Sequence, residues 1–294
     1  MEYQNNIGVV GLGSMGSGIA LSLISKVRKI GVFDIDRDKM KPLASFNVDI
    51  YNSVEELVES CRTIFLSLPT SKVTVEVIEN NILPTIRENQ TIIDTGTTIV
   101  NETRRLFELL KKRGAQFIDA PVSGGTIGSA TGQLYCFVGG EANAVRERWS
   151  ELSDIATERL TYCGSSGSGQ VAKCVNQLSM GLVSAAYLEA IAFGVTSGVD
   201  ASVLLNAVGG SEGFRLEFSR YASRVIENKA DGMDHKSAEF EYFLDEADRS
   251  GFKAPLLRTL NNYLEHRPKD FRDNMGRAYA SFWSALVESK EGKQ

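Results

Sequence analysis

The sequence predicts a doubly wound α/β domain with a mostly parallel sheet, followed by an all-α domain, with one long helix joining the two. Three observations predict this architecture. Short runs rich in β-branched residues alternate with helical patterns through the first half of the 294 residues. The alternation stops near residue 164, and no convincing strand follows. A long, weakly interrupted helical pattern then covers about residues 169–195. Strand–helix alternation of this kind is typical of a parallel sheet covered by helices on both faces.

The elements of the first half follow from these patterns one by one. We expect six strands, at Ile7–Val10, Lys29–Phe33, Thr63–Leu68, Thr91–Thr95, Phe117–Ala120 and Tyr135–Val138. Helical patterns lie between them, at Met15–Ser25, Val73–Ile86 and Glu102–Arg113. Ser53 followed by Glu56 indicates a capping box that opens a further short helix.

The second half is expected to be helical throughout. After the long helix, helices are predicted at Ala201–Val208, Leu216–Ile226, Ser237–Arg249, Leu256–Leu264 and Met275–Val287. We therefore predict two domains, residues 1–164 and 165–294. No Gly/Ser-rich or Pro-rich linker separates them, so the long helix itself is expected to connect them. The polar tail 288–294 is expected to fray.

Composition narrows the classes of function. Hydrophobic residues make up 43% and charged residues 23%, which is ordinary for a soluble globular protein. The net charge of -5 provides no basic surface for nucleic acid or an anionic membrane. We find no apolar run near the ~20 residues that span a bilayer, and no signal-peptide pattern. We therefore expect a cytoplasmic protein with no nucleic-acid or membrane partner.

Few side chains are available for metal or nucleophile chemistry. The four cysteines are scattered and show neither a C-x-x-C pair nor zinc-ligand spacing: Cys61, Cys136, Cys163 and Cys174. We expect them to be reduced thiols that pack as small hydrophobes. The two histidines, His235 and His266, lie late in the chain, far from any glycine-rich turn. We therefore predict no metal site and no Ser–His–Asp triad.

A glycine-rich turn follows the first expected strand and opens the first helix. Gly11, Gly13 and Gly16 fit the pattern G-x-G-x-x-G. Gly11 permits the tight turn, Gly13 lets a pyrophosphate approach the backbone, and Gly16 lets helix and strand pack closely. The helix N-terminus offers free N–H groups and a positive dipole end to the phosphates. This strand–turn–helix context predicts a dinucleotide site of the Rossmann type.

Asp34 indicates which dinucleotide is bound. It ends the second expected strand, 18 residues after Gly16. A carboxylate there accepts hydrogen bonds from the adenosine ribose hydroxyls and repels a 2′-phosphate. Arg37 lies close enough to leave NADP open. We therefore predict NAD as the cofactor, with NADP possible.

Several blocks, in order along nearly the whole chain, together resemble one enzyme family. They are Gly11-Leu-Gly-Ser-Met-Gly16, Asp119-Ala-Pro-Val-Ser-Gly-Gly-Thr-Ile-Gly-Ser-Ala-Thr-Gly132 and Gly164-Ser-Ser-Gly-Ser-Gly-Gln-Val-Ala-Lys-Cys-Val-Asn-Gln177, with weaker matches at Leu68-Pro69 and Asp94-Thr-Gly-Thr97. These blocks resemble the β-hydroxyacid dehydrogenase family. The resemblance implies dinucleotide contacts from Gly11, Leu12, Gly13, Ser14, Met15, Gly16, Asp34, Leu68, Pro69 and Thr97.

The resemblance also implies where the substrate binds. It names Ser123, Gly124 and Gly125 as contacts to a carboxylate and a hydroxyl. From the residues alone, this segment is a glycine- and serine-rich loop after a strand, with exposed N–H groups that suit an anion. A flexible hairpin loop without a ligand is the alternative that composition alone favours.

Lys173 is the catalytic residue that the resemblance implies. Lys173, Asn176 and Gln177 fall at i, i+3 and i+4 on one helical face. The residues alone would make Lys173 an exposed helix lysine. Alcohol oxidation needs a group that removes the hydroxyl proton. A free lysine, with a pKa of ~10.4, is a poor base at neutral pH. Burial beside a cationic nicotinamide would lower that pKa. Asn176 or Gln177 would orient the substrate.

The chain departs from the family in its second half. Ala238 and Glu239 occupy the positions of a usual Lys-Asp pair, and Lys236 lies two residues from the missing lysine. The leading hypothesis is an oxidoreductase that transfers hydride between NAD(H) and a small 3-hydroxy acid or semialdehyde, with Lys173 as general acid and base. The resemblance also implies a homodimer or homotetramer. An imine reductase-like enzyme and a non-catalytic dinucleotide-binding interaction protein are the alternatives, and Lys173 argues against both.

Overall fold

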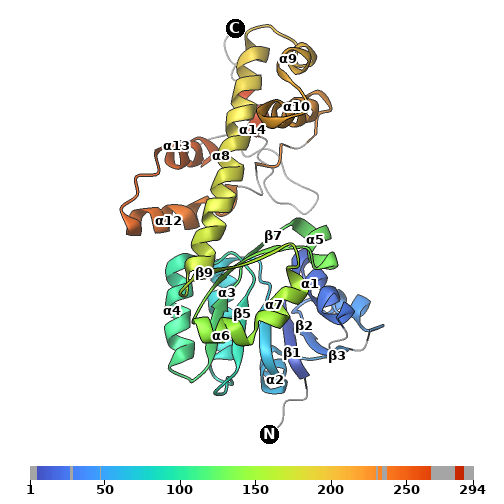
Figure 1. The fold of residues 1–294 in the computed structure, drawn as a ribbon, viewed down its shortest axis with the longest axis vertical. Coiled ribbons are helices and arrows are strands. Elements are labelled where there is room, and N and C mark those ends of the chain that lie inside the picture. Colours follow the sequence, from blue (N-terminus) through green and yellow to red (C-terminus); the bar gives the residue numbers. More distant parts are fainter. Residues whose placement is uncertain are drawn as a thin grey trace. The chain divides into compact units, whose positions relative to one another are not determined.

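The computed structural model describes residues 5–26, 29–46, 48–229, 231–233, 237–265 and 282–287 (Figure 1). The chain forms two compact units, Met1–Cys174 and Val175–Gln294. The division lies inside one helix, α8 (Ser168–Thr196). The domain boundary near residue 164 stays a prediction, and the two units are described one at a time.

A nine-stranded sheet forms the centre of the first unit. Its strands are β1 (Asn5–Val10), β2 (Ile30–Phe33), β3 (Val48–Ile50), β4 (Cys61–Leu66), β5 (Thr91–Asp94), β6 (Gln116–Asp119), β7 (Val122–Ser123), β8 (Tyr135–Gly139) and β9 (Arg159–Gly164). Their order is β3-β2-β1-β4-β5-β6-β8-β7, with β9 paired to β8. All pairs are parallel except those of β8 with β6 and with β7. This confirms the predicted, mostly parallel sheet.

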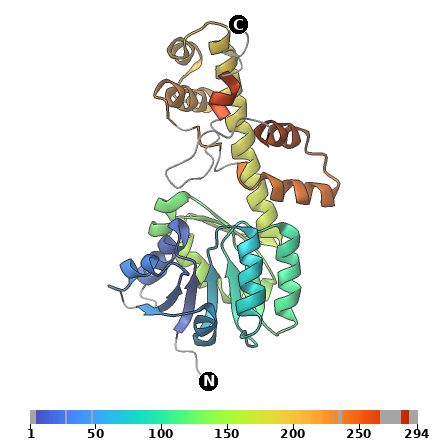
Figure 2. The same ribbon diagram turned by 180° about the vertical axis from the view of Figure 1, so that it is seen from behind.

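Helices cover both faces of this sheet (Figures 1 and 2). Those of the first unit before α8 are α1 (Ser14–Ser25), η1 (Arg37–Lys39), η2 (Lys41–Leu43), α2 (Val54–Ser60), α3 (Ser71–Val77), η3 (Ile78–Ile82), α4 (Val100–Lys111), α5 (Gly125–Thr131), α6 (Ala142–Glu147) and α7 (Trp149–Ile155). The single helix expected at Val73–Ile86 is α3 continued by the π-helical turn η3. At α2, the backbone N–H of Glu56 donates to Ser53 Oγ at 3.2 Å, as the capping-box prediction requires.

The core explains why the helices must lie on both faces. Neighbouring residues along a strand, such as Val9 and Val10, belong to two different hydrophobic clusters. The same holds for Phe65 and Ile64. Because successive side chains of a strand point to opposite faces, each of these strands is buried on both sides. The sheet is therefore doubly wound, as the β-branched runs predicted.

The structure differs from the sequence-based expectation in several segments, because its sheet has nine strands where six were expected: β3, β7 and β9 were not predicted. Residues 125–131 were expected to be a loop, but they form helix α5. This helix packs closely against α1, because a Cβ on Gly18 would lie 2.1 Å from Ser129 Oγ. The glycines and threonines of this helix have weak helix propensity, so the sequence shows no helical pattern there. Tertiary packing overrides this weak propensity.

Among the residues of the second unit that the structure describes, the regular elements are helices and no strand occurs. It contains the rest of α8, followed by α9 (Ala201–Val208), α10 (Gly213–Ile226), α12 (Phe240–Ser250), α13 (Pro255–Glu265) and α14 (Phe282–Val287). Ile191 of α8 packs with Phe218 and Ala222 of α10 in a small core. The predicted helix Met275–Val287 is described only over 282–287, and the tail 288–294 lies outside the described residues.

Helix α8 corrects one expectation from composition. Among the described residues it is the one helix long and apolar enough to cross a membrane, with a mean hydropathy of 1.6 over an 18-residue window. The statement that no apolar run approaches a spanning length is therefore wrong for α8. Length and composition are weak evidence for a membrane span, because the core helix of a soluble protein shares them.

Candidate functional site

The predicted cofactor and substrate segments meet at one edge of the sheet. Five neighbouring parallel strands, β2, β1, β4, β5 and β6, end at the carboxyl edge of the first unit. The residues that follow them are Asp34, Gly11, Leu68, Thr97 and Ser123, respectively. The chain runs outward from β1 to β3 and returns to β4 on the other side of β1. Ligands bind at such a switch point, outside the carboxyl ends of the strands.

The three glycines of the first turn are needed for different reasons. Gly11 has a φ of +89°, and a Cβ there would lie 2.4 Å from the carbonyl oxygen of Ser67. A Cβ on Gly16 would lie 1.9 Å from the carbonyl oxygen of Gly11. Gly13, in contrast, has a φ of -63° and no heavy atom within 4 Å of its Cβ position. The protein itself does not require glycine at 13, so the open space there fits a close-approaching ligand.

The N-terminus of α1 is suited to hold an anion beside Gly13. Gly13 is the N-cap and provides no side-chain cap, and the first turn contains no acidic residue. The first N–H groups of a helix have no partner inside the helix, and the helix dipole makes this end positive. The backbone of Ser14, Met15 and Gly16 supplies those groups. Together with the open space at Gly13, this end fits the pyrophosphate of a dinucleotide.

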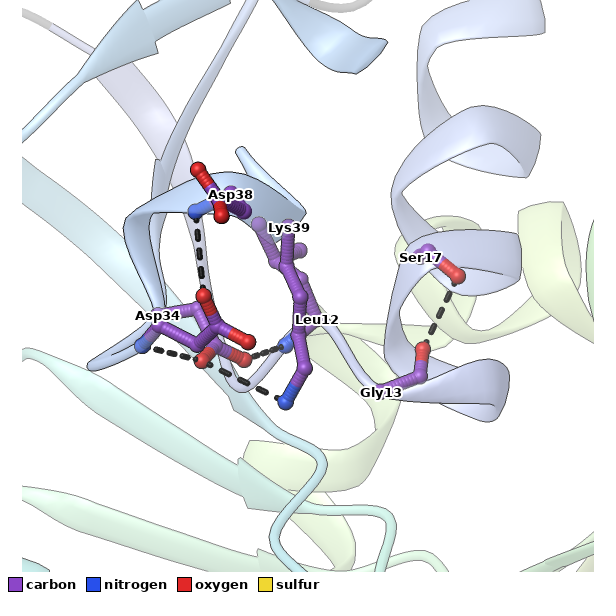
Figure 3. A network of polar contacts seen from close by, with 7 residues as sticks. Leu12, Gly13, Ser17, Asp34, Asp38 and Lys39 are labelled. Atoms are coloured by element: carbon purple, nitrogen blue, oxygen red, sulfur yellow. Dashed lines mark hydrogen bonds and ion pairs between the residues drawn. The ribbon is translucent and has the colours of Figure 1, made fainter. Parts of the chain in front are cut away.

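Asp34 lies next to this turn, held by contacts from both sides (Figure 3). Its side chain is 6% exposed. Oδ2 accepts a hydrogen bond from the N–H of Leu12 at 2.6 Å, and Oδ1 accepts one from the N–H of Asp36 at 2.8 Å. Lys39 Nζ lies 3.6 Å from Oδ1, and sequence reasoning did not single out this lysine. Because each carboxylate oxygen has two acceptor positions, Asp34 can still bind ribose hydroxyls.

Leu68 and Thr97 lie on two adjoining loops of the same edge. Leu68 is close to the glycine turn, because a Cβ on Gly11 would be 3.2 Å from Leu68 Cδ2. A Cβ on Gly96, the neighbour of Thr97, would be 3.4 Å from the carbonyl oxygen of Leu68. Pro69 is exposed. The structure therefore brings the predicted cofactor segments together in the first unit, and their contacts with a cofactor stay predictions.

The predicted substrate segment follows β6 and β7. Gly124 has a φ of +137° and Gly125 a φ of +66°, conformations that favour glycine. A Cβ at Gly124 would lie 3.1 Å from a methyl of Leu134, whereas a Cβ at Gly125 would have no neighbouring heavy atom within 4 Å. Ser123 is half-buried. The turn thus presents backbone to open space at Gly125, which suits a small anionic group.

Lys173 is buried, so the interpretation of it as an exposed helix lysine is wrong. Its side chain is 7% exposed. Nζ donates a hydrogen bond to the carbonyl oxygen of Val122 at 2.8 Å, directly before Ser123. A buried amine requires hydrogen-bonding partners, and this carbonyl fixes the amine beside the predicted substrate segment. Both residues belong to the first unit.

Asn176 and Gln177 belong to the second unit. Asn176 Nδ2 donates to Gln177 Oε1 at 3.3 Å, and Gln177 Nε2 donates to Glu239 Oε2 at 3.3 Å. Glu239 is thus a partner of one of the two predicted substrate amides. Ala238 is exposed, and Lys236 lies outside the described residues. The substrate contacts of Asn176 and Gln177 stay predictions.

Two buried acids at this edge have no role assigned by sequence reasoning. Asp94 and Asp119 end the paired strands β5 and β6 and are 0% exposed. Burial raises the pKa of Asp94 to about 7, against hydrogen bonds from Thr98 and Gly96 that lower it. Burial also raises the pKa of Asp119, against hydrogen bonds from the N–H groups of Gly167 and Gln170. A strand of apolar residues that ends in an acid is the sequence signal that could have indicated both.

Metal ligation is not evident in the part of the chain that the structure describes. No group of three His, Cys, Asp or Glu side chains gathers there to hold an ion. His235 and His266 lie outside the described residues, so the prediction of no metal site stays a prediction.

Two family models match the chain in sequence. One is the NAD binding domain of 6-phosphogluconate dehydrogenase, over residues 6–164. The other is the NAD-binding domain of NADP-dependent 3-hydroxyisobutyrate dehydrogenase, over residues 167–273. The two matches cover the two halves that differ in secondary structure.

Curated relatives include a probable mitochondrial 3-hydroxyisobutyrate dehydrogenase of Dictyostelium discoideum. It is 34% identical over 199 residues, which is 67% of this chain and 62% of the relative. The aligned part therefore spans less than two thirds of that relative. An NAD-dependent L-serine dehydrogenase of Pseudomonas aeruginosa is 29% identical over 237 residues, 79% of each chain.

Solved structures share the fold. The 3-hydroxyisobutyrate dehydrogenase of Mycobacterium tuberculosis, solved with L-serine, has a TM-score of 0.80 and 23% identity, covering 97% of this chain and 98% of its own. An imine reductase of Bacillus cereus has a TM-score of 0.62 and 18% identity, covering 96% of this chain and 98% of its own. At these identities the matches show the fold alone.

Proposed function

Because this chain belongs to the β-hydroxyacid dehydrogenase family, we propose that it transfers hydride between NAD(H) and a small 3-hydroxy acid or the matching semialdehyde. One observation carries this proposal. Lys173, a buried amine, donates to the carbonyl of Val122, two residues before the glycine turn at 124 and 125. This contact joins a proton-transferring group to a turn suited for a carboxylate.

The carboxyl edge of the sheet would hold the cofactor. The pyrophosphate would bind the N–H groups of Ser14, Met15 and Gly16, with Gly13 leaving room for it. Asp34 would accept hydrogen bonds from the adenosine ribose. When bound, the nicotinamide ring supplies the acceptor or donor of the hydride.

Lys173 would move the proton that accompanies the hydride. In oxidation, Nζ of Lys173 in its neutral form would accept the proton of the substrate hydroxyl, and a bound nicotinamide would supply the acceptor for the hydride that leaves the carbon. The products would be the semialdehyde, the reduced cofactor and the Lys173 ammonium. In the reverse reaction the ammonium returns the proton to the carbonyl oxygen. The Val122 carbonyl holds Nζ in place in both directions.

The substrate class follows from the turn and the relatives. Ser123, Gly124 and Gly125 would bind the carboxylate through hydroxyl and backbone donors. Two relatives are named for 3-hydroxyisobutyrate and L-serine, and these two compounds share a carboxylate and a hydroxyl on the third carbon. We propose substrates of this pattern.

NAD is the proposed cofactor because Asp34 would repel a 2′-phosphate. Lys39 Nζ, 3.6 Å from Asp34 Oδ1, offsets part of this negative charge, and the exposed Arg37 lies two residues before Lys39 in the sequence. NADP therefore stays a weaker second cofactor. Imine reduction is not proposed. Lys173 occupies the position of the family's acid–base residue, and its presence argues against an imine reductase-like enzyme.

We also propose a cytoplasmic homodimer or homotetramer with no nucleic-acid or membrane partner. The net charge of -5 supports the absence of a nucleic-acid partner. Size-exclusion chromatography with light scattering measures the subunit number.

The proposed function is tested by NADH formation at pH 8–9 over a panel of 3-hydroxy acids, with NADP in parallel. We expect turnover with at least one acid, faster with NAD, that is lost in Lys173→Ala. Absence of turnover with every acid and every semialdehyde, while NAD still binds, would contradict the proposal.

A further inference from the structure

The first turn of α8 is attached to the end of β6 by a buried carboxylate. Asp119 Oδ1 accepts a hydrogen bond from the N–H of Gly167 at 2.9 Å, and Oδ2 accepts one from the N–H of Gln170 at 3.1 Å. A charged acceptor at a helix N-terminus is favoured by the helix dipole. Lys173 follows within one turn and donates to Val122, three residues after Asp119. Strand end, helix start and Lys173 thus form a closed ring of contacts.

The side chain of Gln170 connects the same turn to the loop that contains Thr97. Its Oε1 accepts from the N–H of Thr98 at 3.1 Å, and its Nε2 donates to the carbonyl oxygen of Gly96 at 3.0 Å. Asp94 holds this loop from inside, through the N–H of Gly96 at 3.0 Å and Thr98 Oγ1 at 2.6 Å. The loop that contains Thr97, a predicted cofactor contact, is therefore bonded to the helix that carries Lys173.

The hydrogen bonds of Asp119 and Gln170 form a joint between the end of β6, the first turn of α8 and the Thr97 loop. Close packing leaves this joint little freedom to shift. A Cβ on Gly139 would lie 2.6 Å from Asp119 Oδ2, and a Cβ on Gly169 would lie 2.8 Å from the same atom. Gln170 is 0% exposed, as is Asp119. Packing at this density transmits a displacement instead of absorbing it.

We propose that Gln170 and Asp119 are positioning residues, which fix Lys173 relative to both the substrate segment and the Thr97 loop. This inference rests on the proposed function. Neither side chain touches the reacting atoms. Each acts through the first turn of α8, so losing the joint moves Nζ relative to the hydroxyl that it must deprotonate. A misplacement of about 1 Å costs about 100-fold in rate in enzymes that depend on such geometry.

Gln90 provides a matched control at the opposite edge of the sheet. It is also 0% exposed, and its amide likewise bonds to backbone groups: Nε2 donates to the carbonyls of Val58 and Cys61, and Oε1 accepts from the N–H of Arg87, all at 2.6 Å. Gln90→Met and Gln170→Met therefore each remove a buried side-chain amide and its hydrogen bonds to the backbone, one at each edge of the sheet. Methionine keeps the length of the side chain and adds no charge.

The experiment compares the two variants by turnover, NADH affinity and unfolding midpoint. We expect Gln170→Met to lower kcat about tenfold or more, with the Kd for NADH changed less than about threefold. Gln90→Met should lower the unfolding midpoint while retaining the wild-type kcat. Equal kcat values in the two variants would overturn the inference. If Gln170→Met does not fold, Gln170→Glu, which keeps one acceptor for the N–H of Thr98, is measured in its place.

A second readout does not depend on turnover, so it separates this inference from the proposed function. The protein is treated with acetic anhydride. Peptide mass spectrometry then compares the acetylation rate of Lys173 with the acetylation rates of the exposed lysines. Gln170→Met should raise the relative labelling of Lys173, and Gln90→Met should not. Unchanged labelling in Gln170→Met overturns the positioning role even if the wild type shows no dehydrogenase activity.

Discussion

Two buried basic side chains lie at opposite edges of the same sheet, and they differ in the groups that they contact. Arg148 and Lys173 are each 7% exposed. Arg148 lies at the amino edge, where Nε donates to Thr91 Oγ1 at 3.1 Å and the guanidinium lies 3.5 Å from Glu151 and 3.7 Å from Glu147. Lys173 lies at the carboxyl edge and donates to a backbone carbonyl beside a glycine turn. Burial alone therefore does not identify a functional basic residue, and the groups around each side chain are the better guide.

The difference extends to the rest of each edge. At the amino edge, Gln90 and Arg148 bond strand beginnings to neighbouring loops and helices. At the carboxyl edge, open space remains at Gly13 and Gly125. We infer that substitutions at the amino edge change stability and that those at the carboxyl edge change binding or turnover.

The largest expected effect is the difference in kcat between substitutions of the two buried basic residues. Lys173→Met should lower kcat about 10³-fold, because general acid–base catalysis is worth that much, and should leave the Kd for NADH unchanged. Arg148→Met should retain kcat and lower stability by about 2 kcal/mol or more, because it leaves buried partners unsatisfied. Steady-state kinetics and urea unfolding of both variants check this. Comparable losses of kcat in the two would break the comparison.

Asp94 should make the first unit less stable as the pH rises. Its pKa in the folded state is about 7, above the ordinary value of 3.8. Between these values the unfolded carboxyl is ionised while the folded one keeps its proton, so stability falls from about pH 4 to about pH 7. The shift corresponds to at most about 4 kcal/mol.

Asp94→Asn should remove this dependence, because an amide can accept from Gly96 and donate to Thr98. Unfolding is followed at pH 5 and pH 8 by Trp149 fluorescence in a Trp283→Phe background. Asp38→Asn, at an exposed acid, is the control. A stability difference between wild type and Asp94→Asn that stays constant over this range would exclude the raised pKa.

The same substitution at two glycines of one turn should have opposite consequences. Gly16→Ala should lower stability by about 2 kcal/mol, because its Cβ would lie 1.9 Å from a carbonyl oxygen. Gly13→Ala, at a φ of -63° in open space, should leave stability unchanged and weaken NADH binding about tenfold. Fluorescence titration and thermal unfolding measure both. Unweakened NADH binding in Gly13→Ala would place the pyrophosphate elsewhere.

The smallest effect expected is on cofactor choice. Asp34→Ser should lower the preference for NAD over NADP about tenfold, because one carboxylate charge is removed while Lys39 remains. Asp38→Ser removes an exposed charge four residues after Asp34 and should leave the preference unchanged. The preference is measured as the ratio of kcat/KM with NAD to kcat/KM with NADP in each variant. An unchanged ratio in Asp34→Ser would mean that Asp34 does not contact the ribose.

Most elements with strong periodicity could be predicted from the sequence, whereas the strands β3, β7 and β9 were not. Six strands were predicted within two residues at each end, because long β-branched runs between turns have few other interpretations. The strands β3 and β7 have three and two residues, too few for a period to be recognised. Helix α5 begins with Gly-Thr-Ile-Gly, whose residues have low helix propensity. Its stability comes from packing against α1, which no local pattern reveals.

The candidate site was predictable where a motif names a residue, but not where a residue acts through its neighbours. Lys173 and Asp34 were identified in advance, and the burial of both was not. Gln170 lies inside the family-like block 164–177, yet its hydrogen bonds to Gly96 and Thr98 join residues more than seventy positions apart. Such contacts depend on the order of the strands, so they become visible only in the fold.

Hydrogen–deuterium exchange with and without saturating NADH tests the central difference between the two edges most directly. We predict slower exchange on NADH addition in segments 11–16, 34–36, 67–70 and 94–98, all after the carboxyl ends of strands. Segments 88–91, 114–116 and 146–151, at the amino edge, should exchange at unchanged rates. Protection at the amino edge, or no protection at the carboxyl edge at saturating NADH, would contradict the assignment of the carboxyl edge as the cofactor site.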